Sequence, residues 1–239
     1  MDDIGSRLES LRERIARAAE RAGRTASQVR LMAVSKFRPG ADIRAAYAAG
    51  QRLFGESRVQ EAMAKRASDF SVLPGAELHM IVRLQSNKAR AAAETFDCVQ
   101  SLDSARLAGI LGGACRAAGK DMPVFLELHT GEESKAGFRS PDELWEALDA
   151  IASEADASGD EAGGLKPIGL MTMAPYTDDP APIRASFRAL AAAGAEWARR
   201  RPELGRPLLS MGMSNDFEIA VEEGSDMLRI GSLIFGGPA

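Results

Sequence analysis

A lysine stands at the end of a short apolar run. Residues 31–34 are Leu-Met-Ala-Val, Ser35 and Lys36 follow, and Pro39-Gly40 then break the run. An apolar run bounded by turn residues predicts a buried strand, with Lys36 where that strand finishes. A lysine amine at the mouth of a site can form a Schiff base with a carbonyl group. Taken alone, however, the run favours a lysine that simply reaches solvent.

Two later segments have the composition of an anion-binding corner. Residues 210–214 read Ser-Met-Gly-Met-Ser, and Gly231-Ser232 follows the apolar run 227–230. Small residues let the backbone approach an anion, and N–H groups and hydroxyls then donate to it. Either segment alone is more typical of a turn. Because both follow a predicted strand, together they favour a ligand that carries a phosphate.

An arginine, Arg229, interrupts the apolar run 227–230. A buried arginine needs an acceptor or a partner of opposite charge. Arg229 could therefore pair with Glu56 or another acid of the core. The alternative is that it donates to a ligand atom that stays unprotonated.

The combination of a lysine, a phosphate corner and aldehyde chemistry favours pyridoxal 5'-phosphate (PLP), a phosphorylated aldehyde that lysines hold covalently. The alternative chemistry is that of a Schiff-base aldolase acting on a sugar phosphate. Barrel aldolases of that kind commonly carry their lysine on a middle or late strand, whereas Lys36 ends the first predicted strand.

The elements that position these residues alternate regularly along the chain. A helix is expected over residues 4–22, with apolar residues at helical spacing that end at Gly23. The predicted strands are 31–35, 52–54, 78–82, 98–101, 124–129, 168–171, 207–210 and 227–230. The predicted helices between them include 41–49, 57–67, 103–118, 141–154, 181–199 and 215–223. Residues 153–166 are expected to form a flexible surface loop.

Strands that alternate with helices predict a parallel sheet, since parallel neighbours need long crossovers. The expected fold is a single α/β domain over residues 1–239, a (β/α)8 TIM-type barrel with an extra N-terminal helix (residues 1–24) packed on it. An open doubly wound sheet is the alternative. In the barrel, the residues that follow the strands meet at one mouth, where such folds carry their sites.

Composition excludes several classes of protein. The 239 residues are 45% hydrophobic with a net charge of -4, which gives no general attraction to nucleic acid or anionic membrane. Cys98 and Cys115 are too few for a disulfide framework or a four-ligand zinc site. The acidic N-terminus lacks the pattern of a signal peptide, and no apolar run approaches the ~20 residues of a membrane span. We expect a cytoplasmic protein.

The chain resembles the PLP homeostasis protein family, whose single-domain barrel is similar to the N-terminal domain of alanine racemase. The matching segments occur in the order of the family and are residues 33–39 (Ala-Val-Ser-Lys-Phe-Arg-Pro), 54–56 with 59–61, 84–88, 131–137, 169–172, 210–214, and 229–231 with 234–236. They extend from residue 31 to residue 236, so the resemblance covers nearly the whole chain.

The resemblance implies a set of cofactor-binding residues. Lys36 would carry PLP as an internal aldimine. Ser210, Ser214, Gly231 and Ser232 would hold its phosphate. The racemase-like pattern over residues 229–231 implies that Arg229 faces the pyridine nitrogen. An arginine there does not give up its proton easily, so it would keep that nitrogen unprotonated and weaken PLP as an electron sink.

Some positions depart from the pattern of the family. Ser57 stands where an asparagine is usual, and Val82 and Arg83 put bulk and charge at the end of the third strand. His129 replaces a usual asparagine, and we expect it to be a hydrogen-bonded wall of the pocket. Lys135 could serve as a second amine in PLP transfer, although an exposed loop lysine is the more ordinary interpretation.

Two functions follow from the resemblance. One is a non-enzymatic carrier that buffers PLP and passes it to apo-enzymes, with no catalytic residue and as a monomer or weak dimer. The other is a PLP-dependent amino-acid racemase or decarboxylase with Lys36 as acid/base. A racemase needs two bases on opposite faces of its substrate. Few residues follow Gly231, too few for the extra β-domain of the racemases, and of the two tyrosines only Tyr176 is expected in a loop after a strand. The sequence therefore favours the carrier.

Overall fold

The computed structural model describes residues 3–131, 136–158 and 163–237. Eight strands alternate with helices along this part of the chain. The strands are β1 (Arg30–Val34), β2 (Leu53–Glu56), β3 (Glu77–Met80), β4 (Cys98–Leu102), β5 (Asp121–Glu127), β6 (Gly164–Met171), β7 (Leu208–Ser210) and β8 (Met227–Ile230).

The α-helices are α1 (Ile4–Arg21), α2 (Gly40–Ala48), α3 (Val59–Ser68), α4 (Ala89–Thr95), α5 (Ala105–Ala117), α6 (Pro141–Ser158), α7 (Pro180–Arg200), α8 (Phe217–Glu222) and α9 (Ser232–Phe235). Short 3-10 turns lie at Ala26–Gln28, Phe70–Val72, Ser86–Lys88 and Pro202–Leu204. Several helix starts follow from local chemistry. For example, the Glu143 N–H donates to the Ser140 hydroxyl at 3.2 Å, which caps α6 as the sequence indicates.

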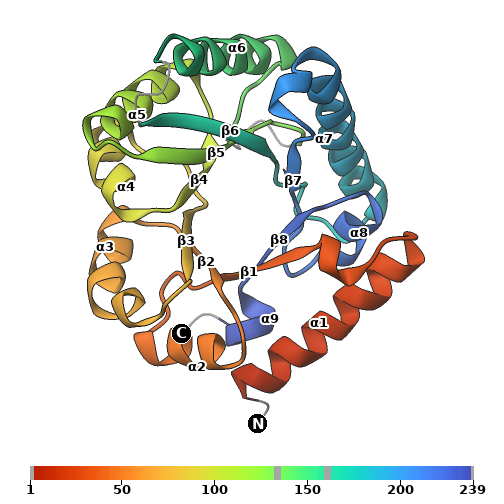
Figure 1. Ribbon diagram of the computed structural model, residues 1–239. Coiled ribbons are helices and arrows are strands. Elements are labelled where there is room, and N and C mark those ends of the chain that lie inside the picture. The colour runs from red at the N-terminus through yellow and green to blue at the C-terminus, as the bar shows by residue number, and fades with distance from the viewer. Residues whose placement is uncertain (1–2, 132–135, 159–162, 238–239) are drawn as a thin grey trace.

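The strands form a closed parallel barrel in sequence order, with β1 paired to β8. Figure 1 looks along the barrel, with the strands inside and the helices around them. The predicted (β/α)8 barrel is therefore confirmed, and the open-sheet alternative is wrong. The closure makes β8 the direct neighbour of β1, with Arg229 in register with Met32.

Alternation along each strand divides the core into two layers. A large apolar layer lies between the strands and the helices, and a smaller cluster fills the barrel with Met32, Leu53, Ile81, Cys98, Phe125, Met171 and Met227. Several polar and charged residues are buried as well, including His79, Gln100, Glu127, Ser210 and Arg229. Since a buried polar group needs a partner, these residues deserve a functional explanation.

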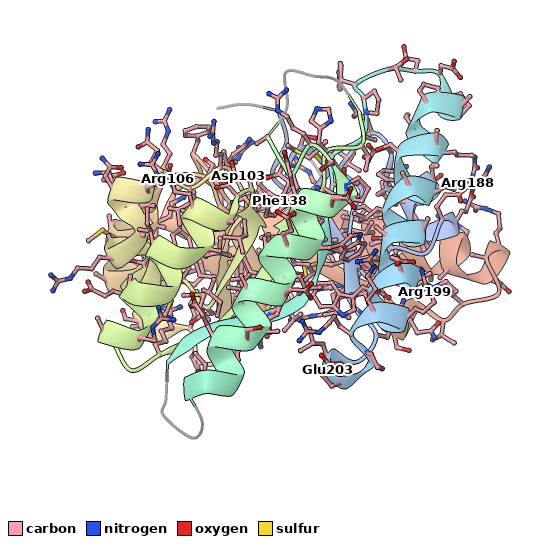
Figure 2. The ribbon with its side chains drawn as sticks, turned by 90° about the horizontal axis from the view of Figure 1, so that it is seen from above. Asp103, Arg106, Phe138, Arg188, Arg199 and Glu203 are labelled. Atoms are coloured by element: carbon pink, nitrogen blue, oxygen red, sulfur yellow. The ribbon has the colours of Figure 1, made fainter. Side chains whose placement is uncertain are left out.

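The two ends of the barrel are separated in the side view of Figure 2. Asp103 and Phe138, which follow β4 and β5, lie at one end, and Glu203, which precedes β7, lies at the other. The outer helices carry exposed ion pairs, such as that between Arg188 on α7 and Glu223 at 2.9 Å. Helix α1 packs outside the ring against α2, α8 and α9.

The structure corrects one element of the sequence prediction. Residues 153–166 are not one loop, because α6 continues to Ser158 and β6 begins at Gly164. Among the described residues, none of the helices combines the length and apolar character that crossing a bilayer requires. Cys98 and Cys115 are both buried free thiols, and burial raises the pKa of each.

Candidate functional site

A cavity of about 390 Å³ opens at the end of the barrel where the strands finish. Its wall is built from residues that follow β1, β3, β6 and β7, and from the end of β8 and the residues after it. A cavity of about 480 Å³ lies at the opposite end, beside the starts of β1 and β2. Barrel enzymes carry their chemistry at the carboxyl ends of the strands, so the first cavity is the candidate site.

Lys36 lies at the rim of this cavity, in a turn directly after β1. The residue is exposed, whereas Ser35 before it is fully buried. A second hollow of about 320 Å³, formed with Phe37, Arg38 and Gly236, is also lined by Lys36. Lys36 therefore lies at the barrel mouth, as predicted, and lines two neighbouring hollows.

The corner predicted to bind phosphate is present in part. Ser214, Gly231 and Ser232 line the cavity beside Lys36. Ser210 is fully buried and is not part of the wall, and its hydroxyl bonds to Gln100 and Arg229, so its contact with phosphate stays a prediction. Gly212 also has a packing role, because a Cβ there would lie 2.5 Å from the Ala220 side chain.

The helix after this corner begins later than predicted. It starts at Phe217, and Asp216 precedes it as the N-cap residue. The Asp216 carboxylate accepts a hydrogen bond from the Met213 N–H at 2.5 Å, which folds residues 213–216 into a tight turn. Asp216 adds one negative charge to a cavity wall that also carries Lys36 and Arg229, so the charged groups of the wall sum to a net positive charge.

Arg229 reaches the cavity from inside the barrel and is 4% exposed. Its guanidinium donates to the Ser210 hydroxyl at 2.7 Å and to the Thr172 carbonyl at 2.8 Å. Burial lowers the pKa of Arg229 to about 10, so the group stays cationic at neutral pH. Its acidic neighbours are Glu127 and Asp216. Of the acids considered as partners, Glu56 does not face Arg229, because it bonds to Lys65 and Ser35, and the other core acid near Arg229 is Glu127.

A buried chain of hydrogen bonds supports Arg229 from below. The Ser210 hydroxyl donates to the Gln100 carbonyl oxygen at 2.7 Å, and Gln100 Nε2 lies 3.0 Å from His79 Nδ1. His79 Nε2 lies 3.4 Å from the Glu77 carboxylate. Arginine can only donate and a carboxylate can only accept, so the direction of every bond is set by the two ends. His79 must carry its proton on Nε2, and burial lowers its pKa, which keeps it neutral.

Glu127 is the second charged group inside the barrel and is 2% exposed. Burial raises its pKa to about 7, and the opposing influence of Arg229 is smaller. Together with Gln100 it was missed by the sequence analysis. A signal existed, since Gln100 lies inside the mainly apolar strand Cys98–Leu102 and Glu127 directly follows the apolar residues 124–126.

The raised pKa of Glu127 predicts a pH-dependent stability. Between pH 4.5 and about 7 the folded protein keeps a proton that the unfolded chain releases, so rising pH costs folding free energy over this range. A Glu127→Gln variant lacks this cost, and its stability relative to wild type should rise by roughly 3 kcal/mol from pH 4 to pH 8. Urea unfolding at several pH values measures the difference, and parallel curves for the two proteins would contradict the prediction.

The departures from the family pattern lie in different places. Val82 lines the cavity, whereas Arg83 turns to Asp103 in an ion pair at 2.9 Å. His129 lines a small hollow beside Glu127 and Thr172, away from Lys36. Ser57 is partly exposed and is not on the cavity wall. Lys135 lies outside the described residues.

Comparisons with known proteins agree with this architecture. The family model for the alanine racemase N-terminal domain matches residues 6–238. The "Pyridoxal phosphate homeostasis protein" of Escherichia coli strain K12 is 38% identical over 239 residues, which cover 99% of this chain and 97% of the relative. The protein of the same name from Aquifex aeolicus is 36% identical over 232 residues, or 96% of each chain.

Solved structures show the same fold. PipY of Synechococcus elongatus, solved with PLP bound, has a TM-score of 0.80 and 38% identity, with 98% of this chain and all of that chain covered. The alanine racemase of Streptomyces coelicolor has a TM-score of 0.68 and 25% identity, and this chain covers 58% of it. The chain therefore belongs to the alanine racemase N-terminal domain family and, within it, to the pyridoxal phosphate homeostasis proteins.

Proposed function

We propose that the protein binds PLP at Lys36 and takes part in PLP homeostasis without catalytic turnover. The observation that carries this proposal is the convergence of Lys36, Ser214, Arg229 and Gly231 on one cavity of about 390 Å³. That volume is within the range of small-ligand sites. The wall offers an amine, small residues for an anion and a fixed cation, which is the donor set that a phosphorylated pyridine aldehyde requires.

Each residue would have a distinct part in holding the cofactor. When bound, PLP supplies an aldehyde that condenses reversibly with an amine and releases one water. Lys36 would provide that amine, and Ser214, Gly231 and Ser232 would donate to the phosphate. Arg229 would face the pyridine nitrogen. Its two hydrogen bonds to Ser210 and Thr172 fix the guanidinium. A guanidinium has no acceptor, so it could only donate to that nitrogen and would leave it unprotonated.

The non-catalytic part of the proposal is supported by the exposure of Tyr176, the one tyrosine among the described residues of the cavity wall. Racemisation needs a base on each face of the substrate, and each must be held in place. Tyr176 is on the cavity wall, but it is 82% exposed, so packing does not fix its hydroxyl. A cavity open to solvent at Lys36 suits a protein that takes up PLP and releases it to apo-enzymes.

One experiment tests binding and its position. Protein incubated with PLP should develop an absorbance band near ~420 nm, as expected for a lysine-bound cofactor. Reduction with borohydride and peptide mass spectrometry should then locate the label on Lys36. Label on another lysine, or none, would contradict the proposed site.

The carrier and the racemase are separated by a second measurement on the same PLP-loaded protein. Incubation with single enantiomers of several amino acids should leave their optical purity unchanged. Rapid racemisation would overturn the non-catalytic proposal while leaving the binding site intact.

A further inference from the structure

Three charged side chains beneath Lys36 form a buried cluster that the proposed function leaves unexplained. Lys65 on α3 donates to Glu56 at 2.8 Å, to Glu61 at 2.7 Å and to the carbonyl oxygen of Ser35 at 2.8 Å. Each of the three ammonium N–H groups therefore has one acceptor. Glu56 also accepts from the Ser35 hydroxyl at 2.7 Å, so Ser35 is held through both its side chain and its backbone.

The same cluster holds the residue on the other side of Lys36. The Phe37 N–H donates to the Glu61 carboxylate at 2.7 Å. Phe37 has a φ of 61°, the left-handed conformation that a bulky residue rarely adopts unless its surroundings impose it. Its exposed ring lies 4.8 Å from the Arg58 guanidinium, which precedes α3. The backbone is thus bonded to the cluster immediately before and immediately after Lys36.

A stabilising role alone does not account for this arrangement. Replacing a buried ion pair by apolar residues of similar volume is often neutral or stabilising, so such clusters are weak evidence for stability. Here the hydrogen bonds that leave the cluster go to Ser35 and Phe37, the two neighbours of Lys36. The residue between them is the one exposed amine on the cavity wall, as far as the chain is described.

We propose that Glu56, Glu61 and Lys65, here called the α3 clamp, are positioning residues that hold the Lys36 turn so that its amine faces the cavity. The proposal rests on the function proposed for Lys36 and extends it. The clamp does not touch the ligand. It acts on the rate and extent of the covalent step by restricting the backbone that carries the amine.

Substitution at Glu61 tests the clamp with little risk to folding, because this carboxylate is partly exposed whereas Glu56 is fully buried. Glu61→Ala removes the acceptor for the Phe37 N–H and is expected to weaken PLP binding about tenfold or more, the usual effect of losing a charged hydrogen bond. Glu61→Gln keeps an oxygen at that position and should recover most of the affinity. Pyridoxine 5'-phosphate, which has an alcohol in place of the aldehyde, should bind all three proteins equally.

Hydrogen–deuterium exchange on PLP-free protein supplies a readout that does not involve the cofactor. The Phe37 amide should exchange faster in Glu61→Ala than in wild type or Glu61→Gln. Glu94→Ala is the matched control, since it breaks the exposed i,i+4 pair with Arg90 on α4 and should change neither binding nor exchange.

Two results would overturn the clamp. One is unchanged PLP affinity in Glu61→Ala, and the other is an equal loss for PLP and pyridoxine 5'-phosphate, which would indicate a general effect on the pocket. Failure of the proposed function has a different signature: wild-type protein would then carry no borohydride-trapped PLP on Lys36, while the exchange experiment would still report on the clamp.

Discussion

A Lys36→Ala variant is expected to form no covalent PLP adduct and to show no absorbance band near ~420 nm. The proposed contacts to the phosphate would remain, so PLP should bind weakly and leave on gel filtration. The residue is exposed and lies in a turn, and its amine forms no hydrogen bond or ion pair with any residue that the structure describes. The midpoint of thermal unfolding should therefore stay within about 2 °C of wild type.

Lys166→Ala is the matched control for this loss. Lys166 is a half-exposed lysine near the start of β6, at the end of the barrel opposite Lys36, and it lies 3.7 Å from Asp121. This variant should be labelled by PLP and borohydride to the same extent as wild type. If Lys36→Ala were labelled to the same extent as wild type, PLP would have to be bound to another lysine.

Much of this architecture is predictable from local patterns. Each apolar run bounded by turn residues became a strand, and β8 begins and ends where expected, at Met227 and Ile230. The alternation of strands and helices was enough to indicate the barrel, because parallel neighbours require crossovers. The position of Lys36 after β1 and of Gly231 after β8 follows from the same patterns.

The relative depth of residues in the barrel is not predictable in this way. Ser210 is the last residue of β7, and the sequence therefore suggested that its side chain lies at the mouth of the barrel. The register places Ser210 opposite Met227, the first residue of β8, and therefore below Arg229. Register depends on the stagger of the closed sheet, a property of all eight strands together. For this reason the sequence could identify Ser210 as polar but could not distinguish a ligand contact from support of Arg229.

Local sequence patterns also do not predict which residues pair with the buried charged groups. Glu56 and Glu127 both end or nearly end a strand, and either could have faced Arg229. In the structure Glu56 forms an ion pair with Lys65 on α3, nine positions later in the chain. Glu127 instead interacts electrostatically with Arg229. The pairing of acids with cations depends on which face of each strand points into the barrel. A one-residue change of register moves every side chain of the strand to the other face.

The second large effect is expected at Arg229. Arg229→Met keeps a flexible, unbranched apolar side chain but removes the donors to Ser210 and Thr172 and the positive charge near Glu127. Removing one partner of a buried charged network typically costs about 3–5 kcal/mol. We expect a loss of this size in the free energy of unfolding at pH 8, measured by urea denaturation. Arg188→Met is the control, because Arg188 is 68% exposed and its pair with Glu223 should contribute less than about 1 kcal/mol.

A double-mutant cycle decides whether charge or packing causes the loss at Arg229. If the uncompensated charge of Glu127 dominates, Glu127→Gln should recover a large part of the stability that Arg229→Met loses at pH 8. The recovery should shrink at pH 5, because Glu127 already carries a proton there and no isolated charge remains to remove. Additive effects at both pH values would instead assign the loss to the broken hydrogen bonds of Ser210 and Thr172, and Arg229 would then be held in the barrel mainly as a donor.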